Sequence, residues 1–368
     1  MILRMLACST CLGLGLVTAP ALGQRPTEGE AASLAAIADD WAQQRDFNGV
    51  ILAVREGEVI FSQVQGIADP DTGRPLDLET RFQTGSVEKY FAAIAVFALV
   101  DSGHLDLDAP LSDYLPDYRA DTGGRLTLRA ILSNQSGLPN DILQAFRAGP
   151  ATVDTLTVSE AVSLFASGDL QFEPGARFDY VLSNWLLVQH LLEVVSGLSY
   201  PEVRQRYVFE PAGMQTSGGY IHDLHETDPE TDNVAIGFVP GQPDARGDYW
   251  APAFFKGSYT TAGDLLRLEH ALEDGLLLSE AGLAEFRSIQ ADEADYAYGG
   301  RFRSWELCGT PYRISTQSGS NGASNITSAY VISAGYGVAM ATNVDESQGA
   351  MFQVSAEMLE VMLGCADD

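Results

Sequence analysis

A serine and a lysine three residues apart, Ser86 and Lys89, are the residues in this chain best suited to nucleophilic chemistry. A long apolar run follows them, so both fall in the first turn of a predicted helix, where positions i and i+3 share one face. A lysine amine in a desolvated site can give up its proton, whereas an arginine guanidinium stays charged. Ser86 is therefore predicted to be a nucleophile, with Lys89 as its general base.

The scarcity of lysine supports this interpretation. Among the 21 basic residues, only Lys89 and Lys256 are lysines, so a lysine retained beside a serine is not a chance surface residue. The backbone N–H of Ser86, at the positive end of the helix, is a candidate donor to a substrate oxyanion. The simpler interpretation is a helix-capping serine beside a lysine whose stem packs along the surface.

The elements around this pair are strands at both ends of the chain and helices between them. Apolar spacing predicts an N-terminal helix over 32–45, and the β-rich runs 48–54 and 59–65 flank turn residues typical of a hairpin. Residues 86–102 are apolar on nearly every side, which predicts a buried helix. Further helices are predicted over 126–132, 159–167, 184–196 and 261–276, and a long surface excursion over 215–250.

The last third of the chain returns to strands, predicted over 297–306, 312–316, 328–333 and 335–342, and closes with a helix over 348–363. This order predicts an α/β fold of the α+β type. One antiparallel sheet is assembled from both chain ends and flanked by the terminal helices, and a helical region is inserted over about 86–290.

Several segments resemble the serine β-lactamase-related family, which includes class C β-lactamases, D-alanyl-D-alanine carboxypeptidases, D-aminopeptidases and β-lactamase-like esterases. The resemblance spans roughly residues 45–345 and is carried most clearly by 81–89, 99–110, 126–132 and 136–139. It implies an acyl-enzyme hydrolase without a cofactor, acting on a small-molecule or peptide-like substrate. The Ser-x-x-Lys pair is the first motif of this family.

The second family motif is Tyr-x-Asn or Tyr-x-Ser, and its match here is Tyr180-Val181-Leu182. The resemblance implies that Tyr180 relays the proton. Leu182 replaces the polar third residue, which predicts a drier site where burial disfavours ionisation of the tyrosine. Asn184 is a second candidate for the missing amide, although it better fits the start of the next helix.

The third motif, Lys-Thr-Gly or His-x-Gly in the family, is matched by Gln317-Ser318-Gly319. Gly319 still permits close backbone approach, and the resemblance implies the Ser320 N–H as second oxyanion donor. Loss of the cation at Gln317 predicts weaker binding of a substrate carboxylate. We therefore expect a hydrolase of esters or small amides, and the alternative is a non-catalytic binding or regulatory protein with the same fold.

The net charge of −29 and a pI near 4.3 argue against nucleic acid as a partner, because its phosphates would be repelled. Residues 1–23 are typical of a secretory signal peptide, leaving 24–368 as an exported hydrolase domain, periplasmic or extracellular. No later apolar run is long enough to insert stably in a membrane.

Export makes a disulfide between Cys308 and Cys365 the favoured prediction over two separate thiols. His222 and His225 lie in an acidic segment, but their spacing matches no defined metal site, and no metal is predicted. The sequence holds no phosphate-binding or dinucleotide-binding fingerprint, so no organic cofactor is predicted. Lys256 is expected in a surface loop, with a role near the site as the other possibility.

Overall fold

A computed structural model describes residues 25–45, 47–221, 233–246, 251–255 and 257–365. The expected signal peptide, His222, His225 and Lys256 lie outside the described residues. No helix in the described part is long and apolar enough to cross a membrane.

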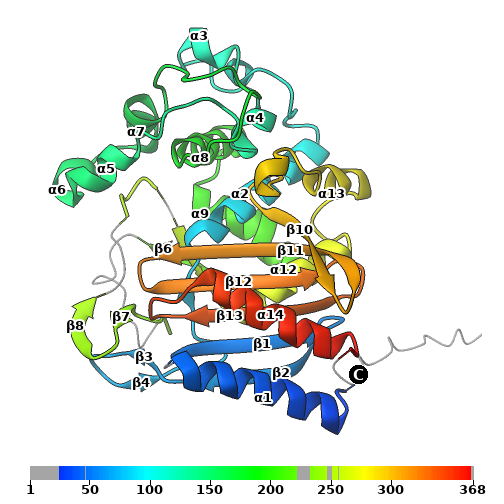
Figure 1. Ribbon diagram of the computed structural model, residues 1–368. Coiled ribbons are helices and arrows are strands. Elements are labelled where there is room, and N and C mark those ends of the chain that lie inside the picture. The colour runs from blue at the N-terminus through cyan, green and yellow to red at the C-terminus, as the bar shows by residue number, and fades with distance from the viewer. Residues whose placement is uncertain (1–24, 46, 222–232, 247–250, 256, 366–368) are drawn as a thin grey trace, which may run out of the picture.

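The centre of the fold is a six-stranded antiparallel sheet with the strand order β10-β11-β12-β13-β1-β2 (Figure 1). Its strands are β1 (Gly49–Arg55), β2 (Glu58–Gln65), β10 (Arg301–Leu307), β11 (Thr310–Asn321), β12 (Ser324–Val331) and β13 (Tyr336–Thr342). β1 pairs with β13, with Ile51 opposite Met340, so the two ends of the chain build one sheet. The predicted fold class is confirmed.

The first hairpin follows from its turn residues. Glu56 and Gly57, which join β1 to β2, both have positive φ, at 50° and 81°. Two consecutive residues with positive φ form the mirror-image turn whose twist matches antiparallel strands, and glycine adopts it without a steric penalty.

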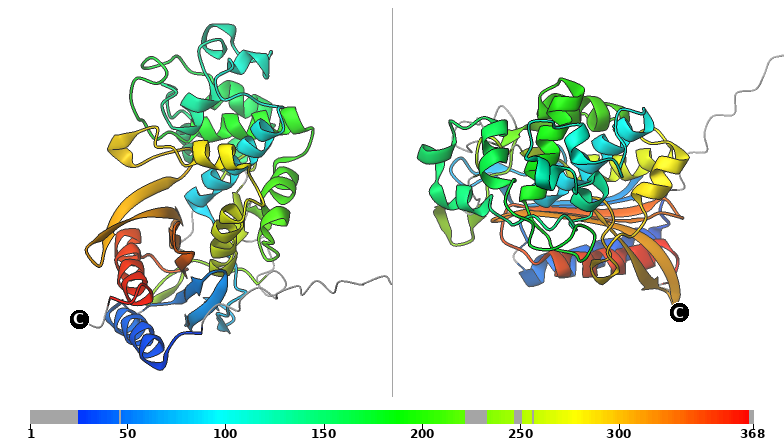
Figure 2. Two further views of the ribbon diagram at one scale, coloured as in Figure 1. Left: turned by 90° about the vertical axis from the view of Figure 1, so that its right-hand side faces the viewer. Right: turned by 90° about the horizontal axis from the view of Figure 1, so that it is seen from above.

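Alternation along the strands divides the core into two layers. Ile51, Ala53 and Met340 face α1 (Glu28–Arg45) and α14 (Gln348–Met362), while Leu52 and Ala341 belong to the larger core on the opposite face. Because strand side chains alternate between faces, a single run of apolar residues serves both layers. The view from above in Figure 2 shows the sheet between the terminal helices and the helical region.

The helical region packs on the inner face of the sheet around α2 (Glu88–Asp101), which is buried along most of its length, as predicted. α8 (Ser183–Ser196) packs against α2, and α12 (Ala262–Glu273) lies on β12 and β13. The remaining helices are shorter: α3 (Ala120–Gly123), α4 (Leu128–Leu132), α5 (Leu143–Ala148), α6 (Pro150–Val153), α7 (Val158–Phe165), α9 (Tyr200–Arg204), α10 (Glu210–Ala212) and α13 (Glu280–Phe286).

Three strand boundaries differ from the sequence prediction by four residues or more: the start of β10, the end of β11 and the start of β12, which lies at Ser324 rather than at Ser328. β10 begins at Arg301 rather than at Ala297, because Ala297–Gly300 form a turn in which the Ala297 N–H donates to the Gly300 carbonyl at 3.0 Å. β11 continues to Asn321, well past the predicted end at Thr316. Its second half is polar and contains a glycine, which disfavours strand locally, but every residue there pairs with β12.

The predicted excursion over 215–250 contributes short strands in its described part. β6 (Gly218–Ile221) joins β9 (Gly257–Thr260) and β5 (Phe82–Gln83) in a small sheet, and β7 (Phe238–Val239) pairs with β8 (Gln242–Arg246). β5 ends two residues before Gly85, so this small sheet anchors the segment that enters α2.

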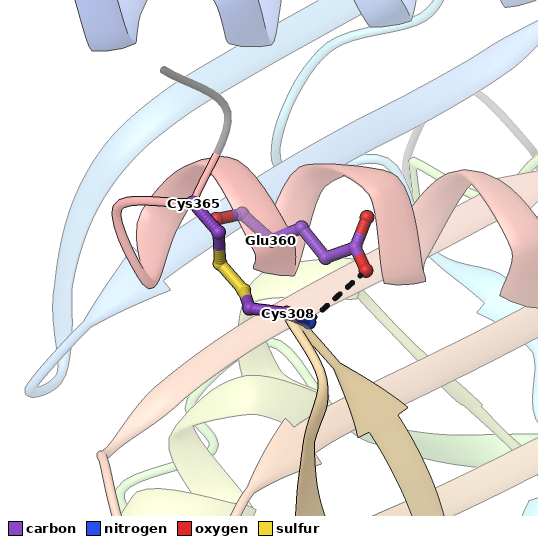
Figure 3. The surroundings of a disulfide bond; sticks show 3 residues. All are labelled: Cys308, Glu360 and Cys365. Carbon is purple, nitrogen blue, oxygen red and sulfur yellow. Dashed lines mark hydrogen bonds between the residues drawn. A yellow bond between two sulfur atoms is a disulfide. The ribbon is translucent and has the colours of Figure 1, made fainter. Parts of the chain in front are cut away.

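The Sγ atoms of Cys308 and Cys365 form a disulfide between Cα atoms 5.7 Å apart (Figure 3). The bond joins the β10–β11 turn to the end of α14, and the Cys308 N–H donates to the Glu360 carboxylate at 3.4 Å. The C-terminal helix is thereby tied to the far edge of the sheet.

Candidate active site

Ser86 lies in the turn of 3-10 helix Gly85–Val87 that leads directly into α2. The turn is possible because Gly85 has a φ of +50°, in the left-handed region that favours glycine. Lys89 follows one turn later and is 6% exposed, so its stem is enclosed while its amine reaches the serine.

The three residues expected to carry the chemistry meet at the Ser86 hydroxyl. Lys89 Nζ donates to Ser86 Oγ at 3.2 Å, and the Tyr180 hydroxyl donates to the same oxygen at 3.0 Å. Both distances lie within the range in which a proton can pass between donor and acceptor. The structure therefore brings together a hydroxyl and two titratable groups in direct hydrogen-bond contact with it.

Tyr180 sits in the loop before α8, where its ring meets that of Tyr296 edge-on, with centroids 6.2 Å apart. Burial opposes ionisation of Tyr180, but the charge of Lys89, hydrogen bonds from Lys89 and Ser86, and the charge of Arg301 outweigh it, so the pKa of Tyr180 is lowered. Burial thus acts on Tyr180 in the direction expected from the sequence, but the net shift of the pKa is opposite, because the expectation omitted these positive neighbours. Sequence reasoning did not identify Arg301, on β10, as a residue that influences the site.

β11 approaches the Ser86 turn so closely that two glycines are required. A Cβ added at Gly319 would lie 1.9 Å from the Thr84 carbonyl oxygen and 2.9 Å from Ser86 N, and one added at Gly85 would lie 2.5 Å from Ser320 N. The backbone nitrogens of Ser86 and Ser320 therefore both lie where β11 meets the Ser86 turn. Two backbone N–H donors close together are what an oxyanion site requires.

Gln317 lies on β11 close to this contact, but its amide turns away. Gln317 is 4% exposed, and its Nε2 donates to Ser315 Oγ at 3.0 Å. Ser315 Oγ in turn donates to the buried carboxylate of Glu269 at 2.8 Å. Half-buried Ser318 alternates to the opposite face of the strand. Gln317, Ser318 and Gly319 are therefore near the site without lining its cavity.

Glu269, on α12, is a buried acid that sequence reasoning missed, because its partners come from other parts of the chain. Burial raises its pKa to about 7, although hydrogen bonds from Ser315 and Tyr90 and the charge of Arg287 act against the increase. The only sequence signal is an acidic residue on the apolar face of an amphipathic helix, where carboxyls are rare.

A cavity of about 280 Å³ opens beside Ser86. Its lining comes from the start of α2, from α5, α8 and α9, from the loop before β9 and from the end of β11: Gly85, Ser86, Glu88, Lys89, Ala92, Phe146, Leu182, Trp185, Gln189, Tyr200, Ala251, Phe255, Gly257, Ser320 and Asn321. Leu182 and Ser320 thus reach the cavity, as expected of residues that contact substrate.

Glu88, between the serine and the lysine, is held away from Lys89 by its own partners. It forms a salt bridge of 2.7 Å with Arg204, whose side chain is fully buried, and accepts hydrogen bonds from Tyr200, Ser258 and Thr84. Sequence reasoning did not identify this network, whose members are as much as 174 residues apart.

Asn184 does not replace the amide lost at Leu182. It is fully buried, donates to Asn134 Oδ1 at 3.1 Å and accepts from Ser136 Oγ at 2.6 Å. The Asn134 carbonyl accepts from the Asp179 N–H at 2.7 Å, so this cluster fixes the loop that carries Tyr180. Across the described residues, no group of three or more His, Cys, Asp or Glu side chains could hold a metal ion.

Comparison with known proteins agrees with this geometry. The sequence family described as Beta-lactamase matches residues 34–361. Esterase EstB from Burkholderia gladioli is 30% identical over 279 residues, which cover 66% of this chain and 70% of the esterase. Penicillin-binding protein 4* from Bacillus subtilis (strain 168) is 26% identical over 75% of this chain, which spans 64% of that protein.

The solved structure of a penicillin-binding protein from Bacillus halodurans superimposes with a TM-score of 0.72 at 25% sequence identity. The superposition covers 90% of this chain and 97% of that chain. The similarity therefore extends over nearly the whole fold.

Proposed function

The chain belongs to the beta-lactamase family of serine hydrolases, and from this membership we propose that it is an exported hydrolase that cleaves ester or small amide bonds through an acyl-enzyme on Ser86. The observation that carries the proposal is the meeting of Lys89 Nζ and the Tyr180 hydroxyl at Ser86 Oγ, at 3.2 Å and 3.0 Å. A serine needs such an adjacent base to become a nucleophile.

In the acylation step, Ser86 Oγ forms a bond to the substrate carbonyl carbon, and its proton passes to Lys89 acting as base. The carbonyl oxygen becomes an oxyanion that the N–H groups of Ser86 and Ser320 stabilise. Tyr180 relays the proton to the leaving oxygen or nitrogen as the carbonyl–leaving-group bond breaks. The pKa of Tyr180 is lowered by Lys89 and Arg301 against the effect of burial, which makes this proton exchange easier than for an ordinary tyrosine. Water then attacks the acyl-enzyme and releases the acid.

Two features favour substrates without a carboxylate next to the scissile bond. Gln317 places a neutral amide where relatives have a cation, and that amide is bound to Ser315 rather than directed at the cavity. Leu182 adds an apolar side chain to the cavity wall. An anionic β-lactam therefore finds no cation at position 317 and no amide at position 182, whereas a neutral ester needs neither.

Export is supported by the leader-like residues 1–23 and by the disulfide between Cys308 and Cys365. Disulfides persist in oxidising compartments, such as the periplasm and the extracellular space.

The test uses protein comprising residues 24–368 and, as a control, its Ser86→Ala variant. Turnover of p-nitrophenyl esters and nitrocefin is measured, together with covalent labelling by a fluorescent penicillin. We expect ester turnover that Ser86→Ala abolishes, and a mass increase on Ser86 equal to the acyl group. A folded protein that no probe acylates would refute the hydrolase and favour a non-catalytic binding protein.

A further inference from the structure

The cavity beside Ser86 has walls that are mostly apolar. Seven of its lining residues carry apolar or aromatic side chains: Ala92, Phe146, Leu182, Trp185, Tyr200, Ala251 and Phe255. Ala92 lies one turn beyond Glu88 on α2, so the cavity follows the helix inward from the nucleophile. Apolar groups leave water favourably in such a space.

Apart from Lys89, the charged residue that lines this cavity is Glu88, and its charge is neutralised by Arg204 behind the wall. Each oxygen of the Glu88 carboxylate accepts two hydrogen bonds: Oε1 from Arg204 and Tyr200, and Oε2 from Ser258 and Thr84. Arg204 also donates to the Gly219 carbonyl at 3.3 Å. A charged substrate group that passes beyond Lys89 would therefore meet a carboxylate that is already paired, and would lose its hydration.

The position of Tyr180 decides which part of a substrate enters the cavity. Tyr180 contacts Ser86 Oγ but is not part of the cavity lining. Because Tyr180 hands the proton to the leaving group, the leaving group must lie on its side of Ser86. The acyl chain, on the other side of the carbonyl carbon, then points into the cavity.

We propose that this cavity is an acyl pocket that selects esters of neutral apolar carboxylic acids, with the Glu88–Arg204 pair excluding charged acyl groups. The proposal rests on the hydrolase activity proposed above. The cavity volume of about 280 Å³ leaves room for an acyl chain of several carbons.

The test compares p-nitrophenyl esters from acetate to octanoate, in which only the acyl chain changes. Each buried methylene is worth roughly a fourfold gain in kcat/KM, so we expect hexanoate to exceed acetate by at least about 30-fold. Ala92→Phe should reduce this ratio to below about 5, because the new ring occupies the space of the acyl chain. Ala36→Phe, at an exposed position of α1 across the sheet, should keep the wild-type ratio.

A second comparison tests exclusion of charge. The p-nitrophenyl half-ester of glutarate should be at least about 100-fold poorer than the pentanoate ester of equal chain length. Glu88→Gln leaves Arg204 without its carboxylate and should narrow this gap by about tenfold. Leu182→Phe, which constricts the pocket from α8, serves if Ala92→Phe fails to fold.

The outcomes separate the two proposals. A chain-length preference that both pocket-filling variants leave unchanged would overturn the acyl pocket, as would equal rates for all acyl chains. The acyl pocket would also be overturned if, in a series of alkyl acetates, kcat/KM rose with the length of the alcohol chain. In each of these cases the hydrolase would stand, whereas absence of turnover with every ester would refute the hydrolase itself.

Discussion

Glu269→Gln is expected to change how the stability of the protein depends on pH. Glu269 is 1% exposed, and its carboxyl contacts Ser315 and Tyr90 from two other elements. Arg287 and Glu273 also act on it electrostatically, and burial is the largest influence. Glutamine keeps the size of the side chain and, like the protonated acid, carries one accepting oxygen and one donor, while removing its ionisation.

The sign follows from the raised pKa. Burial moves the pKa of Glu269 from 4.5 to about 7, so between these values the folded protein holds a proton that the unfolded chain has released. Stability therefore falls as the pH rises through this window and is lowest, from this group, above pH 7. A span of about 2.5 pH units at about 1.4 kcal/mol each gives a loss of about 3 kcal/mol.

Urea unfolding followed by circular dichroism at pH 4.5, 6, 7 and 8, at constant ionic strength, measures this loss. The free energy of unfolding of Glu269→Gln relative to wild type should rise by about 3 kcal/mol from pH 4.5 to 8. Glu357→Gln, at an exposed position of α14, is the matched control and should show no such trend. Parallel curves for Glu269→Gln and wild type would refute the assignment of a buried, late-ionising carboxyl.

Three further perturbations test the site and the fold. Gly319→Ala should lower kcat/KM for a neutral ester at least about 100-fold, because its Cβ would lie 1.9 Å from a backbone carbonyl oxygen of the nucleophile turn. Gly349→Ala, where the added Cβ meets only an ordinary contact, should leave kcat/KM unchanged, and an equal loss in both variants would contradict the close-approach argument. Tyr180→Phe should lower kcat by about 10²- to 10⁴-fold in steady-state assays, and wild-type rates would exclude it as the proton relay. Replacing both Cys308 and Cys365 by serine should lower the free energy of unfolding by about 4 kcal/mol, since the bond spans 57 residues. Denaturation of oxidised, reduced and variant protein checks this value, and identical midpoints for all three would argue against a stabilising bond.

The sequence was sufficient for features whose cause is local. The apolar run after Ser86 predicted the buried helix α2, and the turn residues Glu56 and Gly57 predicted the first hairpin. Helical spacing predicted that Ser86 and Lys89 share one face, and in the structure Lys89 Nζ lies 3.2 Å from Ser86 Oγ. These features depend on residues that are close together in the sequence, so the pattern of side chains along the chain is enough to predict them.

The boundaries of the later strands were less predictable. β11 extends through Gln317 and Gly319 to Asn321, although polar residues and glycine disfavour strand there. The pairing of this segment with β12 outweighs local propensity. The contact of Gly319 with the nucleophile turn then makes glycine a requirement rather than a weakness.

The chemical character of the site was decided by contacts that no local pattern encodes. Gln317 could be recognised as a neutral residue in place of a cation, but only the fold shows its amide bound to Ser315. The ion pair of Glu88 with the buried Arg204 joins residues 116 apart in the sequence. The sequence by itself therefore determined the fold class and the nucleophile pair, because helix periodicity and strand alternation are local. Tertiary structure alone decided the lowered pKa of Tyr180, the pairing of Glu88 with Arg204 and the buried Glu269 carboxyl, because burial and charge depend on neighbours that folding brings from distant parts of the chain.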